Sequence, residues 1–109
     1  MTDAENAYKD ATVVERELVV RSATAYRADL ADTLDDLGIL YSGTHRIADA
    51  EAALKEAAAI DRELVERNPA AYRPDLARTL RNLSSLYREM HRDSEAKALD
   101  VEVQAAVQK

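Results

Sequence analysis

The sequence predicts an all-α protein built as an α-solenoid, in which antiparallel helix pairs stack side by side. Three observations support this fold class. First, 47% of the 109 residues are hydrophobic and 33% are charged, with only 2 Gly and 2 Pro, a composition typical of helical proteins. Second, the chain repeats itself at an interval of 46 residues. Third, each copy of the repeat carries apolar residues at helical spacing.

The repeat is visible when the chain is shifted by 46 residues. Ala25–Arg46 then lies over Ala71–Arg92, and thirteen of these 22 positions are identical. The same shift places Met1–Arg21 over Ile47–Arg67. The sequence therefore predicts one domain over residues 1–109, made of a partial repeat at 1–22 and two full repeats at 25–68 and 71–109.

Each full copy predicts two helices, here called A and B. Helix A carries apolar residues at i, i+4, i+7 and i+11, which form one face of a helix. In the two copies these residues are Leu30, Leu34, Leu37 and Tyr41, and Leu76, Leu80, Leu83 and Tyr87. The partial repeat supplies only a helix B, so the predicted order is B-A-B-A-B. The five predicted helices cover residues 2–21, 26–42, 46–67, 73–89 and 93–107.

Proline, glycine and hydroxyl residues mark the predicted helix boundaries. Asn68 is expected to end a helix B because the residue before a proline avoids the α conformation. Pro74 suits the first turn of the second helix A. Between the first helix A and the next helix B, Gly43 is predicted to end one helix and Thr44 to cap the other.

Small residues in the middle of helix A predict close helix packing. Gly38 and Ser84 occupy the same position in the two copies, although Gly costs about 1 kcal/mol relative to Ala inside a helix. A small side chain there lets helix B approach, with Ala50 or Ala96 expected at the contact. One helix pair cannot bury its apolar face alone, so neighbouring pairs are expected to cover it. A closed bundle of the five helices is the alternative.

The repeat resembles a known family. The residues that carry the resemblance are Leu34, Leu37, Gly38, Tyr41, Ala50, Leu54 and Ala57, and in the next copy Leu80, Leu83, Ser84, Tyr87 and Ala96. They are similar to the tetratricopeptide repeat, while Asp100 and Val103 depart from it. The period of 46 residues resembles the extended, kinesin-light-chain-like repeats of bacterial proteins. The resemblance implies a right-handed superhelix and, as a class of function, protein–protein binding.

The polar side of helix A differs in charge between the two copies. The resemblance implies that this side lines a concave groove that holds extended peptides, so we expect its arginines to contact carboxylates and its aspartates to contact basic groups. The candidate ligand-binding residues are Asp32, Asp35, Asp36, Arg78, Arg81, Asn82 and Arg88. A second interpretation stays open: stacked A helices bring Asp32 to Arg78 and Asp35 to Arg81 as ion pairs between repeats.

Catalysis and metal binding are not predicted. The chain has no Cys, which excludes disulfides, thiolate metal sites and cysteine nucleophiles. His45 and His91 occupy the same position in the repeat, so we expect a shared role in the turn rather than metal ligation. Asp35 and Asp36 are adjacent carboxylates, but neighbouring side chains on a helix point about 100° apart and do not converge on one substrate. We therefore expect no enzyme activity, no metal and no cofactor.

Charge and hydropathy indicate the class of partner. The net charge of −6 disfavours nucleic acid, and the sequence shows neither a long apolar run nor a signal peptide, which favours a cytoplasmic protein away from membranes. We expect a non-catalytic module that binds a peptide or protein segment on the concave helix-A face. One alternative is a self-assembling scaffold that forms homo-oligomers through exposed end helices, the first with Val13, Val19 and Val20 and the last with Val101 and Val107. The other is a regulatory fragment of a larger multidomain protein.

Overall fold

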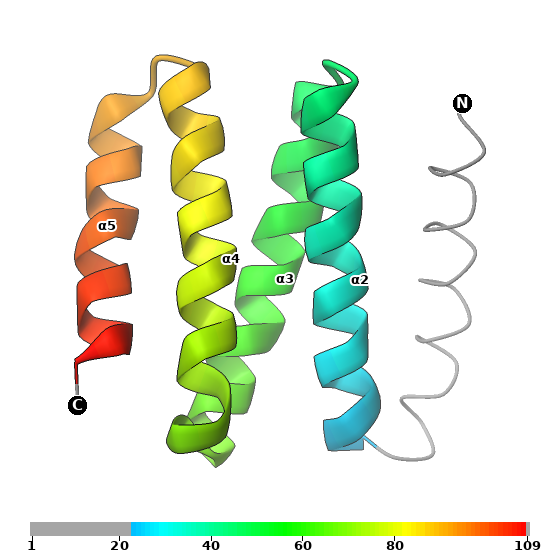
Figure 1. Ribbon diagram of the computed structural model, residues 1–109, viewed down its shortest axis with the longest axis vertical. Coiled ribbons are helices and arrows are strands. Elements are labelled where there is room, and N and C mark those ends of the chain that lie inside the picture. The colour runs from blue at the N-terminus through cyan, green and yellow to red at the C-terminus, as the bar shows by residue number, and fades with distance from the viewer. Residues whose placement is uncertain (1–22, 109) are drawn as a thin grey trace.

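The computed structural model describes residues 23–108, and this part of the chain folds into helices joined by short turns (Figure 1). The helices are α2 (Ala23–Gly43), α3 (Ile47–Arg67), α4 (Pro69–Glu89) and α5 (Asp93–Val107). They correspond to the last four predicted helices, in the predicted order A-B-A-B. The first predicted helix, over residues 2–21, lies outside the described residues.

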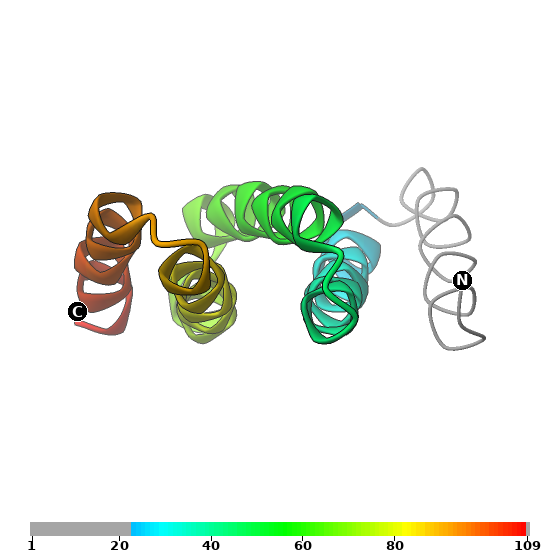
Figure 2. The same ribbon diagram turned by 90° about the horizontal axis from the view of Figure 1, so that it is seen from above.

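The described helices form an open row. Each one runs antiparallel to the next and packs against it, and α2 also touches α4 (Figure 1). Seen from above, α2 and α4 lie on one side of the row and α3 on the other (Figure 2). Since α2 and α5 stand at opposite ends of this row and do not pack together, the described helices do not close into a bundle.

The core follows the predicted apolar pattern. All eight residues of the two helix-A stripes are buried, each with at most 6% of its surface exposed. Helix B contributes small and branched residues to the same core, among them Ala50, Ala57 and Leu64, at 0 to 1% exposure. In the described residues, apolar side chains are buried both within the helix pairs, α2 with α3 and α4 with α5, and between them, where α3 packs on α4.

The start of α4 differs from the prediction. The helix begins at Pro69 rather than at residue 73, and Pro74 therefore lies inside it instead of in its first turn. Asn68 explains the difference, because it ends α3 and its side-chain oxygen also accepts a hydrogen bond from the backbone N–H of Ala71, at 3.3 Å. With this cap, Pro69 takes the first helical position, where its missing N–H is not needed.

The turn between α2 and α3 also differs from the prediction. Gly43 is the last residue of α2 but does not adopt a positive φ. The Thr44 hydroxyl donates back to the carbonyl oxygen of Leu40 at 3.0 Å, so it closes α2 and does not cap α3. The N-cap of α3 is instead Arg46, whose side chain makes no capping hydrogen bond.

The two histidines have a shared backbone role. His45 and His91 have φ values of 60° and 59°, and they are the non-glycine residues with positive φ in the described part of the chain. The next residue in each turn, Arg46 or Arg92, donates its N–H to a carbonyl in the last turn of helix A at 2.8 Å. Their identical position in the repeat therefore reflects the same left-handed turn.

The predicted close packing at Gly38 and Ser84 is confirmed, with a different partner in the first case. A Cβ atom at Gly38 would lie 2.6 Å from Cγ of Leu54, where Ala50 was expected. The Ser84 hydroxyl lies 3.3 Å from the carbonyl oxygen of Ala96 and 2.8 Å from a carboxylate oxygen of Asp100. Asp100 occupies the position of Leu54 one repeat later, so an apolar contact in one repeat becomes a polar one in the next.

Candidate functional site

Three buried polar residues meet where α2, α3 and α4 come together. Asp35 of α2, Asp61 of α3 and Thr79 of α4 expose 3%, 2% and 0% of their surface. The Thr79 hydroxyl oxygen lies 2.7 Å from Oδ2 of Asp35 and 2.8 Å from Oδ2 of Asp61. We call these three residues the acid cluster. It joins the first full repeat to the second.

The contacts of the acid cluster favour protonation of one of its two carboxyl groups. A hydroxyl has a single hydrogen and can donate to only one of two carboxylates. Both contacts are satisfied when Asp61 is protonated and donates to Thr79, which then donates to Asp35. Burial raises the pKa of Asp61 to about 6, against the opposing effect of the hydrogen bond from Thr79, and the negative charges of Asp35, Asp75 and Asp32 raise it further.

Asp35 is surrounded by donors from α4. Besides Thr79, it accepts hydrogen bonds from Nε of Arg78 at 3.3 Å and from Nδ2 of Asn82 at 3.2 Å. Arg78 also pairs with Asp32 at 2.6 Å. The structure therefore brings together four of the seven predicted site residues, and the predicted ion pair between Asp32 and Arg78 is confirmed.

The other predicted ion pair, between Asp35 and Arg81, is wrong. In α4, Arg78, Thr79 and Asn82 occupy the positions that face Asp35, and Arg78 takes the place expected for Arg81. Arg81 lies instead beside the end of α5, in a hollow described below. It forms no ion pair with any residue that the structure describes.

Arg88 lies apart from the acid cluster. Its guanidinium pairs with the carboxylate of Asp100 and lies 2.7 Å from the Ser84 hydroxyl, so it joins α4 to α5 within one repeat. The same contacts from Ser84 and Arg88 lower the pKa of Asp100.

A groove runs along the surface between α2 and α4. Its cavity volume is about 280 Å³, and Leu54 of α3 lies at its base. We call it the helix-A groove. Its lining residues on α2 are Gly38, Ile39, Ser42 and Gly43, and on α4 they are Asn82, Ser85, Leu86 and Glu89. Asn82 is the one predicted site residue that lines it. Among the other lining residues, Ile39 could have been noticed in the sequence, because it lies outside the apolar stripe of its helix. In the structure it is 55% exposed.

Carboxylates dominate the charge around the helix-A groove. Glu89 lines it, and Asp36 lies one turn before Ile39 on the same face of α2. Both are exposed, and neither forms an ion pair within residues 23–108. Partial burial, followed by the neighbouring charges of Asp35 and Asp32, raises the pKa of Asp36. The charge of Arg78 acts in the opposite direction and lowers this pKa.

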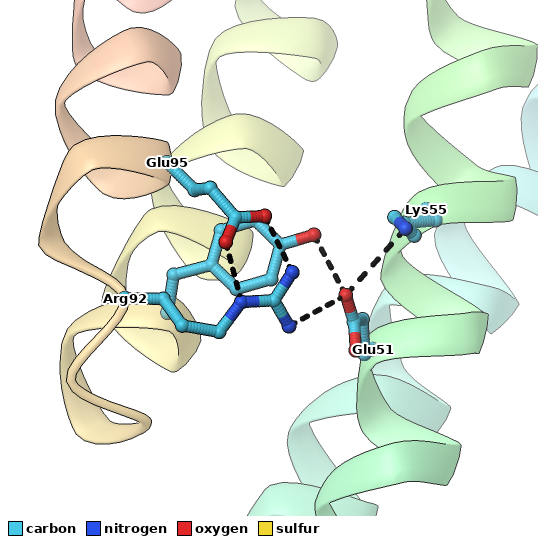
Figure 3. Close-up of polar contacts among 5 residues, drawn as sticks. Glu51, Lys55, Arg92 and Glu95 are labelled. Carbon is cyan, nitrogen blue, oxygen red and sulfur yellow. Dashed lines mark hydrogen bonds and ion pairs between the residues drawn. The ribbon is translucent and has the colours of Figure 1, made fainter.

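A second polar cluster ties the turn before α5 to α3 (Figure 3). Glu51 of α3 accepts a hydrogen bond from the Tyr87 hydroxyl at 2.9 Å and pairs with Arg92 at 3.1 Å and Lys55 at 3.5 Å. The Arg92 guanidinium also pairs with Glu95 and lies over the Tyr87 ring, 4.4 Å from its centre. Burial and the bond to Glu51 raise the pKa of Tyr87 to about 12. These contacts fix how the repeats stack.

The stacked arginine recurs one repeat earlier. Arg46 lies over the Tyr41 ring, 4.7 Å from its centre, and pairs with Asp49 at 2.7 Å. Sequence reasoning missed both stacked pairs. The available signal was an arginine five residues after the last aromatic residue of helix A in each copy.

No group of three or more His, Asp or Glu side chains among residues 23–108 could hold a metal ion. None of the helices α2 to α5 is both long and apolar enough to cross a bilayer.

Comparison with known proteins supports the class that the fold indicates. Residues 30–70 match the family model of the tetratricopeptide repeat, over most of α2, all of α3 and the start of α4. Repeats of this family are in general non-catalytic modules that mediate protein–protein interaction. No curated protein matches the chain, and no solved structure does.

Proposed function

We propose that this chain is a tetratricopeptide-type solenoid that binds an extended peptide in the helix-A groove. The observation that carries the proposal is the groove itself. It lies between two successive A helices and combines an exposed isoleucine with hydroxyl, amide and carboxylate groups. Ligand pockets commonly combine an apolar surface with a few polar groups in this way.

The groove chemistry favours a peptide with both apolar and basic side chains. Asn82 donates its amide N–H to Asp35, so its amide oxygen remains to accept a peptide N–H. Ile39 supplies an apolar contact, and Glu89 and Asp36 supply negative charge for a lysine or arginine of the peptide. An extended peptide exposes backbone donors and acceptors that hydroxyl and amide side chains can satisfy.

The predicted site residues then divide into two roles. Asp36, Asn82 and Ile39 contact the peptide. Ser85 and Glu89, which the sequence alone did not indicate, contact it as well. The remaining residues have other roles: Asp32, Asp35 and Arg78 hold α2 and α4 together, Arg88 holds α5 to α4, and Arg81 lies outside the groove. Because Arg78 and Arg88 are already paired with carboxylates, a basic peptide fits the groove better than an acidic one.

The test uses a display library of random peptides selected on the intact chain. We expect selected peptides to carry Lys or Arg next to an apolar residue. Replacing a serine in the groove by a large cation, Ser85→Arg, should weaken their binding by about tenfold or more. Ser94→Arg introduces the same charge at an exposed serine of α5, outside the groove, and should change affinity by no more than about twofold. Equal effects of the two variants, or selection of acidic peptides, would contradict the proposal.

The other predicted properties belong to the same proposal. The period of 46 residues supports the extended, kinesin-light-chain-like subtype of bacterial proteins, with a cytoplasmic, cofactor-free and non-catalytic role. Self-assembly is the second candidate function. Val101 and Val107 of α5 favour it, because they are 71% and 50% exposed. Light scattering at two concentrations about tenfold apart tests it, since self-assembly through α5 gives a mass above 12.1 kDa that falls on dilution.

A further inference from the structure

A second hollow lies at the C-terminal edge of the row, between the start of α4 and the end of α5. Its volume is about 400 Å³. Ala77, Ala106 and Val107 supply apolar surface, while Arg73 and Arg81 supply positive charge. We call it the C-terminal groove. It does not share lining residues with the helix-A groove.

The internal repeat shows what a surface of this kind holds. A shift of 46 residues relates the lining of the C-terminal groove to positions in the first full repeat: Ala77 to Ala31, Arg81 to Asp35, Ala106 to Ile60 and Val107 to Asp61. That earlier surface is covered by α4. Tyr72 of α4 packs against the cluster that contains Ala31 and Ile60, and Thr79 of α4 contacts both Asp35 and Asp61. The C-terminal groove is thus the next copy of a surface that already holds a helix.

The chemistry of the groove differs from that of its earlier copy. The two buried carboxylates of the acid cluster are replaced by a cation, Arg81, and an apolar residue, Val107. Arg81 is exposed and forms no ion pair within the described part of the chain. A helix bound here therefore needs carboxylates near Arg81 and an apolar residue near Val107. At the equivalent positions of the earlier repeat, α4 instead carries hydrogen-bond donors for Asp35 and Asp61.

We propose that the C-terminal groove binds an amphipathic helix of a partner protein that carries acidic residues beside its apolar face. The repeat defines the register. In α4, Arg78, Thr79 and Asn82 surround Asp35, so the corresponding positions of the partner helix surround Arg81. Acidic residues at the positions equivalent to Arg78 and Asn82 reach Arg81. An apolar residue at the position equivalent to Thr79 packs on Val107. Charge complementarity selects such a partner against a basic helix.

The probe is a synthetic helix that takes its sequence from α4 itself. A peptide of residues 68–90 with Arg78→Glu, Thr79→Val and Asn82→Glu is held helical by a hydrocarbon staple on its outward face and labelled with a fluorophore. Its binding to the intact chain is followed by anisotropy. The matched control is the stapled peptide without the three substitutions. We expect the acidic peptide to bind at least about tenfold more tightly than the control.

Charge reversal in the protein separates specific from general effects. Arg81→Glu in the protein should weaken binding of the acidic peptide by about tenfold or more and strengthen binding of the control peptide. Lys97→Glu makes the same change of charge on an exposed position of α5 outside the groove, and should leave both affinities within about twofold. Ser85→Arg, which blocks the helix-A groove, should not affect either peptide. The failure of this proposal is therefore distinct from a failure of the proposed function.

Three results would overturn the proposal. The acidic peptide could fail to bind at concentrations up to about 1 mM, which corresponds to only about −4 kcal/mol. It could bind equally well to the chain with Arg81→Glu. The intact chain could also form a dimer that Arg81→Glu abolishes, which would assign the groove to a second copy of the chain instead of a partner helix.

Discussion

At the scale of single residues, Gly38 sets the distance between α2 and α3. Replacing it by alanine puts a Cβ atom 2.6 Å from Cγ of the buried Leu54. Overpacking of this kind costs about 1–3 kcal/mol, against about 1 kcal/mol gained from the higher helix propensity of alanine. We predict that Gly38→Ala lowers the free energy of unfolding by up to about 2 kcal/mol in urea denaturation.

Gly43 provides the matched control for that prediction. A Cβ atom there has no neighbour within 4 Å, and its φ is not positive. Gly43→Ala should leave stability unchanged or raise it by up to about 1 kcal/mol. If both variants had the same stability, the absence of a side chain at Gly38 would not be what allows α2 and α3 to pack closely.

The raised pKa of Asp61 predicts an unusual dependence of folding stability on pH. Its pKa of about 6 in the folded chain exceeds the value of about 3.9 for an exposed aspartate. The folded state therefore holds more protons between about pH 4 and pH 6, and the contribution of this group to stability falls as the pH rises through that range. The shift corresponds to about 2–3 kcal/mol at 1.4 kcal/mol per pKa unit.

The variant Asp61→Asn isolates this effect, because the amide keeps the shape of the carboxyl group but does not ionise. Denaturation curves of both chains between about pH 4 and pH 8 give the difference in stability. The free energy of unfolding of the variant, measured relative to that of the original chain, should rise by about 2–3 kcal/mol from the acid to the alkaline end of this range. The charged groups that face Asp61 are Asp32 and Asp35 on α2 and Asp75 on α4, and all of them remain in both chains. A constant difference across the range would mean that Asp61 is not protonated in the fold.

At the scale of helices, one arginine holds α2 and α4 in register. Arg78 contacts the half-exposed Asp32 and the buried Asp35. Exposed ion pairs contribute about 0–1 kcal/mol, whereas a charge contact to a buried carboxylate contributes more because water screens it less. Double-mutant cycles should therefore give a larger coupling energy for Arg78 with Asp35, about 1–3 kcal/mol, than for Arg78 with Asp32. The reverse order would show that the buried carboxylate relies on Thr79 and Asn82 instead.

Polar contacts between repeats also join α3 to α4, to the turn before α5 and to α5 itself. Arg62 of α3 makes two hydrogen bonds to Glu102 of α5, at 2.7 and 2.8 Å, and Glu51 joins the Arg92–Tyr87 stack. Successive B helices are thus held by polar contacts much as successive A helices are. The row of helices is therefore held by polar contacts on both of its sides.

At the scale of the whole molecule, the repeat made most of the fold predictable. A shift of 46 residues located the helices, and the spacing of leucines identified the stripe that is buried. The start of α4 was not predictable in the same way, because Asn68 could either end α3 or cap α4 and in fact does both.

The site was less predictable than the fold. Repeat alignment paired Asp35 with Arg81, but packing of α4 turns Arg78 and Thr79 toward that carboxylate. The shift relates equivalent residues, whereas contacts across a helix interface depend on how far one helix has slid and rotated against the other. Asp61 was missed because helix B carries many acidic residues, and only the packed structure shows which one is buried.

Binding of an extended peptide in the helix-A groove can be followed directly in a backbone-amide NMR spectrum of the ¹⁵N-labelled chain, titrated with a peptide selected on that chain. We expect chemical shifts to change around Ile39, Asn82 and Ser85 and not on the exposed side of α5 around Val101. Ser85→Arg should remove these changes. Shift changes confined to α3 and α5, or unaffected by Ser85→Arg, would contradict it.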